Sequence, residues 1–372
     1  MTSEELEPAS DPDVRELLDW AIEQSPLSIS LLDTEMRQVQ LNQAAYRQLG
    51  LPPETLMGRR PNDLFLSPLT ELAVAQARVV ARTGELARLR LVGRGERRAR
   101  AWEVWLSPVQ DPAGQAHGVL TVSVEVTEQH QARQRLALVN EASTRIGTTL
   151  DVTRTAEELV EVSVPQLADL VLVDVLDSVL LGGEPISGPV GTAPMRRMAI
   201  GSVLEGCPEV VVRPGEVSSY PGPSPFADCL NTGRTERYDS RAPEMVKWAA
   251  LSSAQGSSIA RHGMHSMAAV PVRARGTTLG IAIFVRHRQA EPFEDDDVLL
   301  AEEIVARAAV CIDNARRYTR EHATALALQN SLLQQRRPVV SAVEVATQYW
   351  PAQSGVGGDW FDVIRLSGSR IT

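Results

Sequence analysis

The chain has few of the features that tie a protein to a membrane, to nucleic acid or to a secretory route. No stretch of its 372 residues reaches the roughly 18 consecutive apolar side chains that suggest a membrane span. A formal net charge of −10 at pH 7 argues against nucleic acid as a partner. The acidic start lacks the basic residues and apolar core of a signal peptide. We therefore expect neither a membrane nor a nucleic-acid partner.

Cysteine and lysine are also scarce. Cys207, Cys229 and Cys311 are widely spaced and form neither a Cys-x-x-Cys pair nor a disulfide framework. This usage is typical of a reducing compartment, so we expect a cytoplasmic location, with Cys229 and Cys311 as packed side chains. Lys247 is the only lysine among 37 basic residues, which we attribute to genome composition because arginine solvates a surface equally well.

Glycine and proline are absent between Glu294 and Pro338, which predicts one long helix there. Acidic residues at 294–297 suit a helix N-terminus. At 1.5 Å per residue the helix would run roughly 60 Å, and periodicity beyond about 25 residues suggests a coiled coil. Its apolar side chains recur at spacings of three and four: Val298, Ala301, Ile304, Val305, Ala308, Cys311, Ile312, Ala315 and Tyr318.

These spacings predict a parallel homodimer joined along residues 294–336, and also along 128–146. One seam position would hold Ala301, Ala308, Ala315, His322 and Gln329, and the second would hold Ile304, Cys311, Tyr318, Ala325 and Leu332. Val305, Ile312, Thr319, Leu326 and Leu333 would flank the seam. Polar residues at seam positions set register and cost stability, so the segment 319–337 would be a loosened coiled-coil linker. The alternative is that 298–318 packs only on the sheet of its own domain.

The N-terminal third alternates short strands with turns. After an acidic segment at 1–12 that we expect to be disordered, strands are predicted at 27–32 and 39–41, a helix at 42–50, and strands at 88–92, 101–106 and 118–124. Residues 31–65 resemble the front half of a PAS domain, which we assign to 13–127. Glu125-Val126-Thr127 stands where PAS domains commonly end in Asp-x-Thr, and a connecting helix is predicted at 128–147.

The middle of the chain, residues 136–318, is rich in short apolar strands flanked by helices, which favours an α+β domain. Residues 266–318 resemble the closing half of a GAF domain. PAS and GAF resemblances imply antiparallel sheets curved over a pocket for a small-molecule ligand, whose identity stays open. We expect the loop 208–226 to cover an apolar pocket. Its predicted wall is Val171, Val173, Val270, Val272, Ile281 and Ile283.

The C-terminal segment 338–372 carries a glycine-rich turn with two acids, within residues 355–362. Together with the segment 329–346, this turn resembles the opening of a SpoIIE/RsbU-type domain, a bacterial branch of the PP2C (PPM) metal-dependent serine/threonine phosphatases. The resemblance implies Mg²⁺ or Mn²⁺ near Asp359, with Asp362 as a weaker ligand candidate. Gly357 and Gly358 would allow the tight turn.

The same resemblance implies a phosphoprotein substrate, an anti-sigma-factor antagonist of the STAS class. The family's remaining acidic motifs would lie beyond Thr372, so we expect the 372-residue chain itself to be inactive. The run 357–361 also differs at one position from the Gly-Gly-Asp-Glu-Phe motif of cyclic-di-GMP synthases. That position is the catalytic glutamate, which argues against such an enzyme.

Three weaker candidates have structural roles as alternatives. His262 and His265 are three residues apart but would need further metal ligands from elsewhere. His322 is superficially similar to a histidine-kinase phosphoacceptor, yet no kinase ATP-binding region follows. Cys229 near the proline-rich loop is better interpreted as a small packed side chain than as a redox group. Three functions stay open: the sensory region of a phosphatase, a ligand-binding module with another output, and a dimerisation scaffold.

Overall fold

A computed structural model describes residues 13–94, 99–183, 190, 193–220, 222 and 224–333. The chain divides into two compact units, Met1–Gln134 and Arg135–Thr372, and each is described by itself. The predicted end segments 1–12 and 338–372 lie outside the described residues. In the described part, no helix is long and apolar enough to cross a bilayer.

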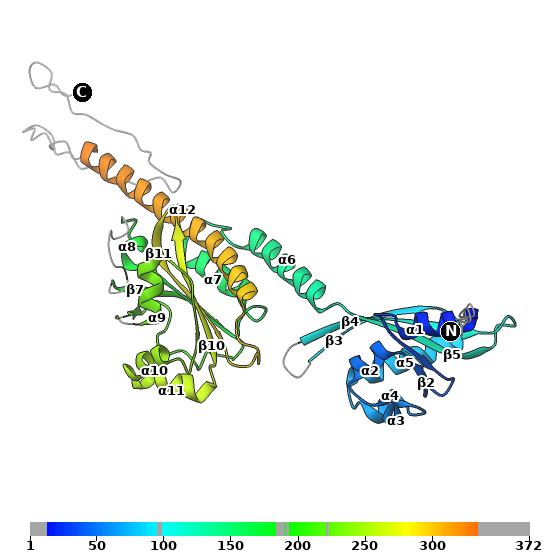
Figure 1. The fold of residues 1–372 in the computed structure, drawn as a ribbon. Coiled ribbons are helices and arrows are strands. Elements are labelled where there is room, and N and C mark those ends of the chain that lie inside the picture. The colour runs from blue at the N-terminus through cyan, green and yellow to red at the C-terminus, as the bar shows by residue number, and fades with distance from the viewer. Residues whose placement is uncertain are drawn as a thin grey trace, which may run out of the picture. The chain divides into compact units, whose positions relative to one another are not determined.

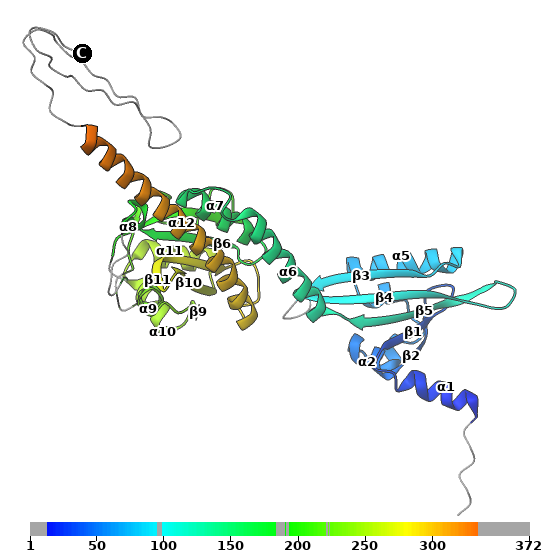
Figure 2. The ribbon, with the colours of Figure 1, turned by 90° about the horizontal axis from the view of Figure 1, so that it is seen from above.

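The first unit is built on a five-stranded antiparallel sheet with the spatial order β2-β1-β5-β4-β3. Figure 2 shows β3, β4 and β5 side by side. The strands expected between residues 27 and 124 are all present, and β4 extends beyond its predicted ends. The bounds are β1 (Ser28–Leu32), β2 (Gln38–Leu41), β3 (Ala87–Arg94), β4 (Ala99–Gln110) and β5 (Ala116–Glu125).

Helices accompany this sheet, and one of 16 residues packs across β3, β4 and β5. That helix, α5, has no counterpart among the predicted elements. Ser67 caps its start by accepting a hydrogen bond from the Leu69 amide at 3.2 Å, and Gly84 ends it in a left-handed conformation. The helices of the unit are α1 (Val14–Glu23), α2 (Gln43–Leu49), α3 (Pro53–Leu56), α4 (Pro61–Leu64), α5 (Pro68–Thr83) and the start of α6 (Thr127–Arg145).

The second unit contains a six-stranded antiparallel sheet with the order β8-β7-β6-β11-β10-β9. Figure 1 labels three of its strands, β7, β10 and β11. Its long central strands are almost wholly apolar because both faces of the sheet are covered. The bounds are β6 (Leu170–Leu176), β7 (Met195–Ser202), β8 (Val217–Ser218), β9 (Glu236–Asp239), β10 (Ser266–Ala274) and β11 (Thr277–Arg286).

One face of this sheet packs on α7 (Val152–Ser163) and α12 (Asp295–Leu333). The other face carries α9 (Pro225–Thr232), α10 (Pro243–Ala250) and α11 (Ser253–His262), whereas α8 (Asp177–Leu180) follows β6. Gly201 on β7 lets α7 approach, because a Cβ at this position would collide with Val160. Leu138 and Ala142 in the last part of α6 and Ile146 just after it are buried, whereas Leu136 is exposed.

The long helix predicted after Glu294 is present as the 39-residue α12, but the predicted dimer seam is wrong over residues 301–315. The seam side chains in this part pack on β10 and α7 of the same chain. Their exposed fraction is at most 1%, except for Cys311, which is half-buried. Spacings of three and four suit a sheet face as well as a partner helix, so periodicity alone did not separate the two. These buried residues are Ala301, Ile304, Val305, Ala308, Ile312 and Ala315.

Candidate ligand-binding cavities

A cavity of about 410 Å³ lies between the sheet of the first unit and helices α2, α4 and α5. We call it the first-unit cavity. Its apolar lining comes mainly from α5, β3 and β4, and its polar lining from β1, β2, β5 and α2. The apolar side chains include Leu32, Leu49, Phe65, Leu69, Val74, Leu91, Trp102, Val104 and Leu106, and the polar ones include Ser28, Ser30, Gln38, Gln48, Ser67, Thr70, Thr121 and Ser123.

Strand register explains this division of the lining. Side chains alternate between the faces of a strand, so Trp102, Val104 and Leu106 of β4 share one face. Directly across the ladder, β5 places Thr121 opposite Leu106 and Ser123 opposite Val104. On the other side of β5, the ladder partners are serines of β1, with Ser30 opposite Thr121 and Ser28 opposite Ser123. The result is a polar row on β1 and β5 beside an apolar row on β4, on the same face of the sheet.

Three buried polar atoms of this lining have no hydrogen-bond partner among the described residues. They are Gln38 Oε1, Trp102 Nε1 and Thr121 Oγ1. By contrast, the Gln48 amide and the Ser123 hydroxyl satisfy each other at 3.0 and 3.2 Å. An unsatisfied buried donor or acceptor costs about 1–3 kcal/mol, so three around one cavity indicate that something else pairs with them.

The chemistry of the lining restricts what the first-unit cavity can hold. None of the described residues around it is charged, and none is histidine or cysteine. Metal ions and haem are held by histidine, cysteine or carboxylate ligands, so these side chains provide no such site. Likewise, no group of three such ligands occurs anywhere in the described ranges.

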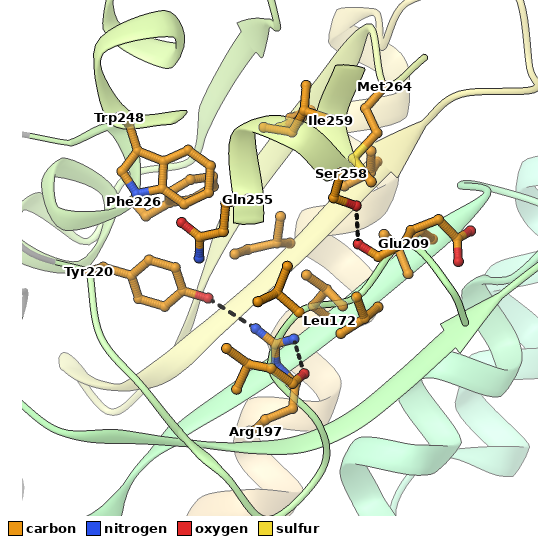
Figure 3. Close-up of a pocket in the computed structure, with 17 residues that line it drawn as sticks. Leu172, Arg197, Glu209, Tyr220, Phe226, Trp248, Gln255, Ser258, Ile259 and Met264 are labelled. Carbon is orange, nitrogen blue, oxygen red and sulfur yellow. Dashed lines mark hydrogen bonds between the residues drawn. The ribbon is translucent and has the colours of Figure 1, made fainter. Parts of the chain in front are cut away.

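The second unit holds a smaller cavity of about 80 Å³ on the face of its sheet opposite α7 (Figure 3). We call it the second-unit cavity. Figure 3 shows Tyr220, Phe226 and Trp248 together on one side, and the guanidinium of Arg197 beside the hydroxyl of Tyr220. Phe226 stacks edge-on against Trp248, with ring centroids 4.7 Å apart. Across the cavity, Ser258 of α11 donates a hydrogen bond to the backbone oxygen of Glu209 at 2.5 Å.

A buried polar cluster fixes the loop to this sheet. Asp174 on β6 pairs with Arg197 on β7, and its Oδ2 accepts hydrogen bonds from Ser218 at 2.7 Å and Tyr220 at 2.5 Å. The guanidinium of Arg197 also donates to the Val212 carbonyl at 3.1 Å. Burial opposes the charge of Arg197, but Tyr220 and Asp174 outweigh it and raise its pKa above the usual value. Burial, followed by the field of Asp174, raises the pKa of Tyr220.

The predicted pocket wall is correct at Ile283 and wrong at four valines. Ile283 lines the second-unit cavity together with its ladder partner Leu172. Val171 is one residue away on β6 and pairs with Gly201, the glycine that faces α7. Because side chains alternate along a strand, Val171, Val173, Val270 and Val272 lie on the face covered by α7 and α12. Ile281 shares the face of Ile283 but does not line the cavity.

The predicted loop 208–226 does cover this cavity, through Glu209, Val210, Val211, Val212, Tyr220 and Phe226. Sequence reasoning missed α10 and α11, which add Trp248, Gln255, Ser258 and Ile259. A signal for α11 was present, because Ser252 is a preferred N-cap residue and accepts a hydrogen bond from the Gln255 amide.

The other candidate residues have structural partners. His262 Nδ1 lies 3.0 Å from the carbonyl of Ser258 on its own helix, and His265 Nε2 lies 2.7 Å from the Gln289 carbonyl, so the two histidines have separate partners. Cys229 is buried, its thiol donates to the Ala269 carbonyl, and burial raises its pKa. Cys311 is half-buried beside Gly147. Asp359, Asp362, Gly357 and Gly358 lie outside the described residues.

Comparison with known families agrees with both units. The family described as PAS fold matches residues 22–131, and the family described as GAF domain matches residues 190–312. The chain therefore contains a PAS domain and a GAF domain, two domain types of signal-transduction proteins. A search of curated protein sequences finds no match.

Solved structures similar to the chain include isolated PAS domains. The PAS domain of the histidine kinase ThkA is 25% identical, covers 26% of this chain and 97% of its own, and has a TM-score of 0.23. The PAS domain of BvgS from Bordetella pertussis is 21% identical, covers 34% of this chain and 96% of its own, and has a TM-score of 0.29. A PAS domain from Colwellia psychrerythraea is 15% identical, covers 31% of this chain and 99% of its own, and has a TM-score of 0.28.

Proposed function

We propose that this chain is the sensory region of a signalling protein, and that a small molecule bound in the first-unit cavity is its signal. The observation that carries the proposal is the cavity itself, at about 410 Å³ with three unpaired buried polar atoms. Ligand pockets typically measure about 300–1,000 Å³ and combine an apolar lining with a few polar groups. The second-unit cavity, at about 80 Å³, falls well below that range.

The start of α6 gives the PAS domain a route for its response. The Ala101 amide on β4 donates to Thr127 Oγ1 at 3.1 Å, and the Val126 amide donates to the Ala101 carbonyl at 2.7 Å. Ala101 is next to the cavity residue Trp102. A ligand that shifts Trp102 would therefore move the strand that holds the first residue of α6.

The GAF domain has a comparable connection at the start of α12. Arg286, at the end of β11, donates to Asp297 Oδ2 at 3.0 Å and stacks on the ring of Phe293 at 4.2 Å. Its guanidinium also reaches the Leu167 carbonyl at 3.1 Å. One buried arginine thus joins the end of the central strand β11 to the first turn of the long helix α12.

We further propose that the controlled output is a PP2C-type serine/threonine phosphatase acting on a phosphorylated STAS-class protein. The support is the sequence of residues 355–362 and its resemblance to the opening of that domain. By that resemblance, Asp359 would lie near Mg²⁺ or Mn²⁺, which carboxylate oxygens bind well. The gene sequence that follows Thr372 tests this proposal: a Gly-Asp-x-x-Gly-x-Gly motif and two later aspartates are expected, and their absence overturns it.

The ligand proposal is tested by a thermal-shift screen of metabolites against the wild-type chain and an Ala77→Phe variant. Ala77 is buried and lines the first-unit cavity, so the larger ring fills part of the space. A true ligand raises the melting temperature of the wild type and not of the variant, since binding at a hundredfold excess over Kd adds about 2.7 kcal/mol.

The matched control is Ala75→Phe, the same substitution at an exposed position of α5. The control should respond to ligand as the wild type does. If no metabolite distinguishes the wild type from Ala77→Phe, the first-unit cavity is not a ligand site and the proposal is wrong.

A further inference from the structure

We infer that the ligand of the first-unit cavity is an uncharged molecule with a mainly apolar body that carries both a hydrogen-bond acceptor and a hydrogen-bond donor. The inference rests on the proposed function, because it names the chemical class that the same cavity selects. Three independent observations support it: the charge of the lining, the identity of the unpaired atoms and the shape of the apolar wall.

The lining excludes ionised ligands. Among the described residues around the cavity, no arginine, lysine or histidine is available for a carboxylate or phosphate, and no aspartate or glutamate for an amine. An ion removed from water without a partner loses several kcal/mol that a polar but neutral lining does not return. Anionic metabolites and free amines should therefore bind poorly whatever their size.

The unpaired atoms define the polar part of the ligand. The indole nitrogen of Trp102 only donates, so it requires a ligand acceptor. The amide oxygen Gln38 Oε1 only accepts, so it requires a ligand donor. The Thr121 hydroxyl can do either. A lactam, amide or hydroxy-substituted heterocycle meets both requirements without a charge.

The apolar wall indicates a flat or compact hydrocarbon body. Leu91 and Trp102 are ladder partners on β3 and β4, so their side chains stand together on the cavity face. Gly93 lets Leu69 pack closely against this wall, because a Cβ there would collide with Leu69. Apolar surface of a ligand that is buried against such a wall stabilises the complex by about 25 cal/mol per Å².

The test compares three bicyclic probes of similar size by isothermal titration calorimetry with the 372-residue chain. Carbostyril is a neutral lactam with one donor and one acceptor, naphthalene has neither, and quinaldate carries a negative charge. We expect carbostyril to bind at least tenfold more tightly than either of the others, because one well-placed buried hydrogen bond is worth about a factor of ten.

Two variants assign the polar contacts. Thr121→Val removes an unpaired polar atom at nearly constant shape, so it should leave the melting temperature of the free protein unchanged or higher while weakening carbostyril binding at least fivefold. Trp102→Phe also removes the indole nitrogen but leaves a smaller ring, so it should lower the melting temperature and weaken carbostyril binding at least fivefold. Trp105→Phe is the matched control, because Trp105 lies on the opposite face of β4 with Arg88 over its ring. It should bind carbostyril as the wild type does.

Each outcome decides a different point. Quinaldate binding as tightly as carbostyril, or naphthalene doing so, overturns the inferred class but leaves the cavity as a ligand site. Carbostyril affinity that is unchanged in both Thr121→Val and Trp102→Phe overturns the assigned contacts and with them the inference. If none of the three probes binds, the inference is wrong, and the metabolite screen with Ala77→Phe decides the proposed function separately.

Discussion

The hydroxyl of Thr127 donates a hydrogen bond of 2.8 Å to the carboxylate of Glu125 while it accepts one of 3.1 Å from the amide of Ala101. The residue that begins α6 is therefore held by the last residue of β5 and by β4. Glutamate occupies the position of the usual PAS aspartate and reaches the threonine two residues later. The departure from Asp-x-Thr noted in the sequence thus keeps a carboxylate-to-threonine contact.

Replacing Thr127 with valine should destabilise the PAS domain by about 1 kcal/mol, because the Ala101 amide loses its acceptor at nearly constant side-chain volume. Urea unfolding of the PAS domain within the full chain, followed by circular dichroism, measures the change. Glu128→Gln is the control, since Glu128 is exposed in the same helical turn. Equal stability of the Thr127→Val and Glu128→Gln variants would show that the contact does not fix α6.

Arg197→Met should be among the most destabilising substitutions in the GAF domain. Its loss leaves Asp174 buried without its cation, and removal of one partner from a buried pair costs about 3–5 kcal/mol. Tyr220→Phe removes the 2.5 Å hydrogen bond to Asp174 and the longer one of 3.4 Å from Arg197, but leaves the ion pair, and should cost about 1–3 kcal/mol.

The neighbouring pair Arg196–Asp177 provides the matched control for this prediction. It has the same chemistry, but about a third of each side chain is exposed, so Arg196→Met should cost less than about 1 kcal/mol. Chemical denaturation ranks the three variants. An Arg196→Met effect as large as that of Arg197→Met would contradict the role assigned to burial.

Asp169 should make the GAF domain sensitive to acid. Burial raises the pKa of this carboxyl, but hydrogen bonds from the backbone amides of Gln289, His287 and Arg288 outweigh burial and lower it below its ordinary value. Because the folded-state pKa is lowered, ionised Asp169 contributes its full share to the free energy of unfolding above the unfolded-state pKa of about 3.9. This contribution is lost as the pH falls through the folded-state pKa.

The stability difference between wild type and Asp169→Asn should therefore be full at pH 7 and shrink below about pH 4. Denaturation at a series of pH values measures it, with Glu205→Gln as an exposed carboxylate control that changes little. A difference that stays constant down to pH 2 would mean that the charge of Asp169 does not contribute.

The strands could be predicted because their apolar alternation and turn residues are local signals. The face on which a strand residue lies was harder, since moving by one residue inverts it. Val171 and Leu172 are adjacent and equally apolar, yet one faces α7 and the other the second-unit cavity. Deciding between them requires knowing which elements cover each face, and that information is not contained in the strand itself.

The cavities could not be predicted from the sequence for a similar reason. Trp102 lies on the strand predicted at 101–106, but its unpaired indole nitrogen follows from what α5 leaves open. The helix α5 buries Val74, Ala77 and Val80 and was not predicted, so the large apolar enclosure of the first-unit cavity was not predicted either. Its polar row depends on β1 pairing with β5 across some ninety residues, a long-range register.

A homodimer remains a prediction for the part of α12 beyond its contact with the GAF sheet. In this part Tyr318 is half-exposed and stacks its ring on His322 at 6.0 Å, and Leu328 is exposed. His322 and Ala325 hold the next two predicted seam positions along the helix, and both are partly exposed, whereas Ala308 and Ala315 are buried in their own domain. Sedimentation at micromolar concentration should give a dimer, and a monomer would end the proposal.

Cysteine crosslinking then locates the contact, in a chain whose three native cysteines are replaced by alanine. In a parallel pair of helices, His322→Cys should crosslink to its symmetry mate because both lie at the seam. Ala308→Cys should not, since Ala308 is fully buried in the core of its own domain. Arg320→Cys is the outward control on the same helix. If Arg320→Cys crosslinks as well as His322→Cys, the helices do not meet at the predicted seam, and a dimer would have to form elsewhere.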